Sequence, residues 1–258
     1  MRNTTNHRRL VFCVSLMFFT GVILLRAQSP TGQEILDRVN AIQNPANSSG
    51  VMTQTIQTSS GQFRTFELES YSANKGEKSL MRYRRPASVK DQAFLMLNNA
   101  DDIWTYFPRT KRVRKLASHA KKQKVQGGDF TYEDMGSGDA WKEEYVPSNL
   151  GEIDLLDERC WKLQMEGIPE KDPAYQKMII MVRQKDYYPL QVDYFADEGD
   201  LMKSLYLEDI REVDGFPTAM RMVMRNHEDG TETWMEILSI TYDWNPPAGF
   251  FSERNLKK

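Results

Sequence analysis

A β-hairpin is predicted by residues 49–72, which read SGVMTQTIQTSSGQFRTFELESYS. Side chains two positions apart point to the same face of a strand, and the first half of this segment places four on one face: Met52, Gln54, Ile56 and Thr58. The Ser60-Gly61 pair is typical of a tight turn, and the partner strand is expected from Gln62 to Ser72.

Outward from this hairpin, further strand-like runs are separated by short polar turns. They occupy residues 79–84, 92–97, 103–107, 111–116, 160–166, 175–183, 190–196, 202–212, 218–226 and 232–242. The alternation of strands and helices that a parallel sheet requires is missing. We therefore predict a mainly β (α+β) fold, with one curved antiparallel sheet or half-open β-barrel of about eleven strands. Either extra helices in Gly127 to Leu150 cover the apolar face of this sheet, or that face is left open for a ligand.

One amphipathic helix is expected before the first strand. Pro30 suits a first helical turn, and Thr31 with Glu34 forms a capping box. The apolar residues that follow share one helical face: Ile35, Leu36, Val39 and Ile42. Pro45 is expected to end this helix.

Residues 1–27 have the features of a signal peptide. A basic start precedes Leu10 to Leu25, a run of sixteen residues without a charge, which is short for a membrane span of about 20 residues. We expect cleavage after Ala27, with an uncleaved anchor as the alternative, and an exported mature domain of residues 28–258.

The composition narrows the class of protein. The net charge is −2, and residues 1–27 contain four Arg and no acid, so the mature chain would carry −6. This acidity and the predicted export both oppose nucleic-acid binding. Cys160 would be the only Cys of the mature chain, and a small buried apolar residue is the favoured interpretation. With few His and no metal, phosphate-loop or nucleophile-elbow motif, we expect no catalytic residues, metal or cofactor.

Bulky apolar side chains on the early strands predict a hydrophobic cavity. Met adapts to varied apolar shapes, and ligand pockets are lined mainly by such side chains. The predicted ligand-binding residues are Phe66, Leu68, Met81, Tyr83, Phe94, Met96, Trp104 and Tyr106. The alternation of side chains along a strand shows which residues share a face, but it leaves open which face of each strand lines this cavity.

Charged residues cluster in the middle of the chain. Between Arg109 and Lys124 lie eight basic residues and no acid. Those proposed for contact with a lipid head group or a partner are Arg109, Lys111, Arg112, Arg114 and Lys115, and a solvated hairpin edge is the equal alternative. The acidic, Gly-rich stretch that follows, 127–144, is interpreted as a flexible loop that neutralises the basic hairpin and gates the cavity.

Three stretches together resemble a known family: IWTYFPRTKRVR at 103–114, GGDFTYEDM at 127–135, and YYPLQVDYF at 187–195 followed by EVDGFPT at 212–218. In this order they are similar to the LolA-like family of outer-membrane lipoprotein-sorting proteins, over nearly all of residues 33–257. The resemblance implies a monomeric periplasmic carrier, whose half-open barrel has a few short helices as a lid and receives lipid or lipoprotein acyl chains. It also implies an RND-type inner-membrane transporter and an outer-membrane acceptor as partners.

Two other functions remain open at this point. One is an envelope scaffold that binds no lipid. The other is an esterase-like hydrolase using His119 or His227, the two histidines that remain after cleavage.

Overall fold

The computed structural model describes residues 29–43, 45–136, 141–196 and 199–258. The predicted signal peptide and residues 197–198 lie outside these ranges. Within the described ranges, no helix is both long and apolar enough to cross a membrane.

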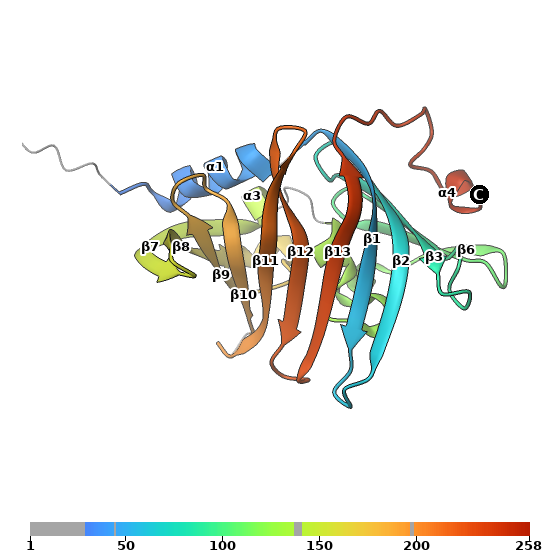
Figure 1. Cartoon of the computed structure of the whole chain (residues 1–258), viewed down its shortest axis with the longest axis horizontal. Helices are drawn as coiled ribbons and strands as arrows, with labels where there is room; N and C mark the ends of the chain where they lie inside the picture. The colour runs from blue at the N-terminus through green and yellow to red at the C-terminus, as the bar shows by residue number, and fades with distance from the viewer. Residues whose placement is uncertain (1–28, 44, 137–140, 197–198) are drawn as a thin grey trace, which may run out of the picture.

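A single antiparallel sheet of thirteen strands makes up most of the molecule (Figure 1). The prediction of one curved antiparallel sheet is confirmed, with two strands more than expected. The strands run in the order β6-β5-β4-β3-β2-β1-β13-β12-β11-β10-β9-β8-β7. Their bounds are β1 Asn47–Gln57, β2 Phe63–Ala73, β3 Lys78–Arg85, β4 Ala93–Leu97, β5 Asp102–Phe107, β6 Arg112–Lys115, β7 Tyr145–Leu155, β8 Glu158–Gly167, β9 Lys177–Arg183, β10 Pro189–Phe195, β11 Leu201–Val213, β12 Phe216–Asn226 and β13 Thr231–Thr241.

The pairing of β1 with β13 places the two ends of the domain at the centre of the sheet. Ile56 lies opposite Thr233, and Gln54 lies opposite Met235. The edges are therefore β6 and β7, which flank the middle of the chain. Residues 116–136, which follow β6, cross one face of the sheet.

One alternative expects extra helices in Gly127 to Leu150. The structure corrects this for residues 145–150, which belong to strand β7. Two short helices do precede it, α2 (Tyr132–Gly136) and α3 (Trp141–Glu144). Pro147 and Gly151 weaken the strand pattern, and a Pro is tolerated in a sheet at an edge strand. The edge position of β7 explains why its sequence does not look like a strand.

Helix α1 (Gly32–Gln43) is the predicted amphipathic helix, and it lies across one end of the sheet (Figure 1). Its capping box is present, because Thr31 Oγ1 accepts from the Glu34 N–H at 3.2 Å and Glu34 Oε2 accepts from the Thr31 N–H at 2.8 Å. Ile35, Leu36 and Val39 are fully buried against the sheet. These contacts cover the inner face at the β7–β12 end.

The sheet has two apolar faces. We call the face that carries Met178, Ile180 and Val182 the inner face, and it is covered by α1 and residues 118–136. The outer face carries Ile179, Met181 and the buried Cys160 at one end of the sheet. At the other end it is covered by the C-terminal tail, which ends in α4 (Glu253–Leu256).

Candidate functional site

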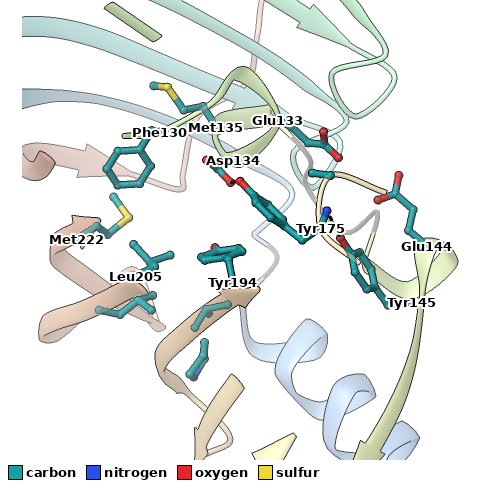
Figure 2. Close-up of a pocket in the computed structure, with 14 residues that line it drawn as sticks. Phe130, Glu133, Asp134, Met135, Glu144, Tyr145, Tyr175, Tyr194, Leu205 and Met222 are labelled. Carbon is teal, nitrogen blue, oxygen red and sulfur yellow. Dashed lines mark hydrogen bonds between the residues drawn. The ribbon is translucent and has the colours of Figure 1, made fainter. Parts of the chain in front are cut away.

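A cavity of about 230 Å³ lies on the inner face between the segment 130–145 and strands β10, β11 and β12. Figure 2 shows the side chains that converge on it. Its lining consists of Phe130, Glu133, Asp134, Met135, Glu144, Tyr145, Ala174, Tyr175, Pro189, Val192, Tyr194, Leu205, Leu207 and Met222. The site is therefore mostly apolar, with three carboxyl groups.

The two ends of this cavity differ in chemistry (Figure 2). Phe130, Leu205 and Met222 form an apolar end, whereas Glu133 and Glu144 lie together at the opposite end, which we call the acidic end. Such a lining can surround a hydrophobic chain and present a polar contact to one terminus of it.

A buried ion pair holds the cavity wall in place. Lys203 Nζ on β11 lies 2.7 Å from Asp134 Oδ2 of α2, and both side chains are about 95% buried. Asp134 also accepts hydrogen bonds from the Tyr175 hydroxyl at 2.9 Å and from the Thr131 N–H at 2.7 Å. The ammonium group lies over the rings of Tyr175 and Tyr194, at 4.9 and 5.0 Å from their centroids. It also donates to the Asp129 carbonyl oxygen at 3.3 Å, so its charge is satisfied by one carboxylate, one carbonyl and two aromatic faces.

Asp129 fixes the start of the same segment. Its carboxylate accepts hydrogen bonds from Thr231 and Thr233 of β13, at 2.6 and 2.8 Å. A Cβ atom at Gly128 would lie only 3.0 Å from the Ile56 side chain, so the segment packs closely on the sheet. The expectation of a flexible loop is therefore wrong for residues 128–134, because buried carboxylates anchor them to distant strands. Residues 137–140 of the suggested gate lie outside the described residues.

Burial raises the pKa values of the carboxyl groups at the acidic end. For Glu133 desolvation is the main cause, and the charges of Glu144 and Asp134 add to it against the opposing effect of Lys121; its pKa is raised to about 7. Desolvation also raises the pKa of Glu144. The acidic end therefore changes charge near neutral pH.

This raised pKa predicts a pH-dependent stability. The native state holds the Glu133 proton more tightly than the unfolded chain, so this stabilising contribution is complete below about pH 4.5 and is lost as pH rises through about 7. We expect Glu133→Gln to raise the free energy of unfolding by about 2 kcal/mol at pH 8 and by much less at pH 5. Urea unfolding at both pH values measures this difference.

The matched control is Glu143→Gln, which neutralises the exposed neighbouring carboxylate of α3. It is expected to change stability little at either pH. A Glu133→Gln variant with the same stability gain at pH 5 and pH 8 would contradict the buried, protonated state of Glu133.

The eight predicted cavity residues are divided between two faces. Six lie in one inner-face cluster around Ile56, Ile103 and Val125: Phe66, Leu68, Met81, Tyr83, Phe94 and Met96. Trp104 and Tyr106 lie on the outer face against the C-terminal tail. The register pairs Trp104 with Leu95 and Tyr106 with Ala93, which both point outward. None of the eight lines the cavity, because Val125, Tyr132 and Met135 fill the space in front of the six.

The proposed contact residues lie on the β5–β6 hairpin at the far edge of the sheet. Arg109, Lys111, Arg112, Arg114 and Lys115 are exposed there. Lys115 pairs with Asp102, and Arg109 and Arg114 line a surface groove of about 260 Å³ beside Phe107. The expected neutralisation of the basic stretch is seen at Lys124, whose Nζ lies 3.7 Å from Asp129 Oδ1, whereas Asp134 is paired with Lys203 instead.

The residues that do form the cavity were not among those predicted. Two of the three stretches that carry the family resemblance supply half of them: 127–135 contributes Phe130, Glu133, Asp134 and Met135, and 187–195 contributes Pro189, Val192 and Tyr194. The family-like stretches therefore indicate the cavity residues, whereas the choice of the eight residues from Phe66 to Tyr106 relies on side-chain size.

Of the two histidines of the hydrolase alternative, the structure describes the side chain of His227, and that of His119 lies outside the described residues. The Ser204 hydroxyl donates to Asp193 Oδ1 at 2.6 Å and lies 3.0 Å from His227 Nε2. In a Ser-His-Asp hydrolase the imidazole lies between the hydroxyl and the carboxylate and accepts the hydroxyl proton. Here Ser204 occupies the middle position and is 1% exposed, so the three side chains do not have the arrangement of a Ser-His-Asp triad.

A curved antiparallel sheet with an apolar cavity on its inner face gives this protein a LolA-type fold, which solved structures share. A putative outer membrane lipoprotein-sorting protein domain from Vibrio parahaemolyticus is 26% identical, with a TM-score of 0.79 over 88% of this chain and 98% of that one. A DUF1329 family protein from Desulfovibrio piger has the same TM-score at 23% identity, over 87% and 97% of the two chains. A LolA superfamily protein from Nitrosomonas europaea gives 0.74 at 20% identity, over 88% and 100%.

A family model described as that of an uncharacterized protein matches residues 75–258, more than half of the chain. The chain belongs to this LolA-like family. No curated protein matches it in sequence.

Proposed function

We propose that this protein is an exported periplasmic carrier, which binds an acyl chain of a lipid or lipoprotein in the inner-face cavity and passes it between envelope partners. The observation that carries the proposal is the apolar cavity, in a fold shared with a protein described as lipoprotein-sorting. No chemical step is needed for this function. Release requires a partner that offers the chain an equally apolar site.

The driving force is removal of the chain from water, which contributes about 0.8 kcal/mol for each buried methylene. Ligand pockets usually measure about 300–1,000 Å³, so a cavity of about 230 Å³ accommodates part of a single chain. The polar terminus of the ligand would then remain at the acidic end, beside Glu133 and Glu144.

Partners are proposed from the exposed surface. The basic β5–β6 hairpin at Arg109–Lys115 would contact anionic head groups or an acidic surface of an RND-type transporter. Each basic residue near an anionic membrane contributes on the order of 1 kcal/mol. The hairpin and the cavity lie at different ends of the sheet, so docking and ligand binding would use separate surfaces.

Filling the cavity tests the carrier function. Met222 on β12 lines the apolar end, and Met222→Trp is expected to reduce co-purifying lipid by about tenfold or more, because the larger side chain takes up space that the chain would occupy. Mass spectrometry of organic extracts, from protein purified out of its native envelope without detergent, measures the loss and names the lipid.

Leu238→Trp is the control, because Leu238 on β13 is 58% exposed and lies outside the cavity lining. This variant should keep the lipid content of the wild type. Equal lipid content in both variants would place the lipid elsewhere on the protein, and the cavity proposal would then be wrong.

An envelope scaffold remains a second candidate, which the exposed apolar side chains of edge strand β7 favour. Val146 and Leu150 are 54% and 50% exposed, and an edge strand can pair with a partner chain. A wild-type protein recovered without lipid, which nevertheless co-purifies with an envelope protein, would support this function instead.

A further inference from the structure

Glu133 is a buried carboxyl group without a complete set of partners. Glu133 is 5% exposed, and its Oε2 atom has no hydrogen-bond partner among the described residues. It lines the cavity at the acidic end, beside Glu144 (Figure 2). A buried acceptor that lacks a donor is costly, so such an atom in a ligand cavity indicates a donor supplied by the ligand.

Among the described residues, the two cations that act on Glu133, Lys121 and Lys122, also lie close to other acids. Lys121 Nζ lies 3.7 Å from Asp101, and Lys122 Nζ lies 3.0 Å from Asp172. The third carboxylate of the cavity, Asp134, is neutralised by Lys203. When both are ionised, Glu133 and Glu144 therefore carry negative charge that no ion pair among the described residues balances.

This polarity selects among hydrophobic ligands. A fatty carboxylate would bring a like charge toward Glu133 and Glu144, which is unfavourable in a partly desolvated site. A ligand with a plain hydrocarbon terminus would leave Glu133 Oε2 unpaired. A protonated amine donates a charge-assisted hydrogen bond to the carboxylate and neutralises part of the excess charge.

We propose that the ligand of this cavity is a cationic amphiphile, in which a single hydrocarbon chain ends in a protonated amine that donates to Glu133. The inference rests on the proposed carrier function and names the class of its cargo. The chain lies toward Phe130, Leu205 and Met222, and the ammonium group lies at the acidic end.

Three probes of equal chain length test this inference: decylamine, decanol and decanoate. Isothermal titration of the full chain at about pH 8 is expected to show decylamine binding about tenfold tighter than decanol, the effect of one hydrogen bond to a charged acceptor, with decanoate weakest. Glu133→Gln should abolish the advantage of decylamine over decanol. Glu143→Gln, on the exposed side of α3, should retain it.

The same advantage should shrink as pH falls to about 5.5. Protonation neutralises the Glu133 carboxylate, whose pKa is about 7, whereas the amine stays charged throughout this range. The pKa of Glu133 also depends on four charged neighbours: Glu144, Asp134, Lys121 and Lys122. If the pH dependence of decylamine binding comes from Glu133 itself, the Glu133→Gln variant should lose it.

The outcomes separate the two proposals. If decanol binds as tightly as decylamine, or decanoate binds best, the carrier function stands and the amine inference is wrong. If none of the three probes binds, both the carrier function and the amine inference fail. An amine advantage that survives in Glu133→Gln would also overturn the role assigned to this residue.

Discussion

Replacing Lys203 by methionine is expected to destabilise the protein by about 3–5 kcal/mol, the usual cost of removing one partner of a buried ion pair. Asp134 would then be a buried carboxylate that keeps its hydrogen bonds from Tyr175 and Thr131 but loses its cation. The wall of the cavity would loosen, since this pair connects α2 to β11. Urea unfolding at pH 7 measures the loss.

Two comparisons isolate the ion pair. Arg211→Met removes an exposed ion pair with Asp209 further along β11 and should change stability little. The double variant Lys203→Met with Asp134→Asn should be more stable than Lys203→Met alone, because no uncompensated charge remains. Equal stability of Lys203→Met and Arg211→Met would show that the buried pair is not required for the fold.

Leu256→Ala is expected to cost about 3–4 kcal/mol, within the range for a fully buried leucine. Leu256 is 0% exposed and packs with Leu80 and Leu95 on the outer face. A hydrogen bond also holds the C-terminal tail next to Leu256, since Arg82 Nη2 donates to the Asn255 carbonyl oxygen at 2.7 Å. Losing the leucine therefore leaves a cavity and weakens the attachment of α4.

Urea unfolding and limited proteolysis at the C-terminus measure both effects. Lys257→Ala, at the exposed neighbouring position, is the control and should behave as wild type. Identical unfolding midpoints and cleavage rates for the two variants would mean that the tail does not stabilise the outer face.

Local patterns were sufficient for most of the elements. The hairpin at residues 49–72 follows from alternation around a turn, and α1 follows from its capping box and apolar stripe. Each depends on residues within a few positions of one another. Strand β7 was missed because Pro147 and Gly151 interrupt its pattern, and only its edge position makes them acceptable.

The candidate site was predicted less well, for two physical reasons. Alternation shows that Trp104 and Tyr106 share a face, but the face itself is set by pairing with β4 and by the tail that covers it. The role of Asp134 depends on Lys203, which lies 69 positions away in the sequence. An isolated acidic motif looks like a solvated loop until its distant cation is known.

The sequence by itself determined the class of fold, the N-terminal helix and most strands, because hydrophobic periodicity and capping act over short distances. Tertiary structure alone decided which half of the inner face stays open, since that depends on how residues 118–136 fill the space in front of Phe66 and Phe94. It also decided that Glu133 is a buried acceptor at the acidic end. Packing and the pairing of buried charges join residues far apart in the chain, so no local pattern specifies them.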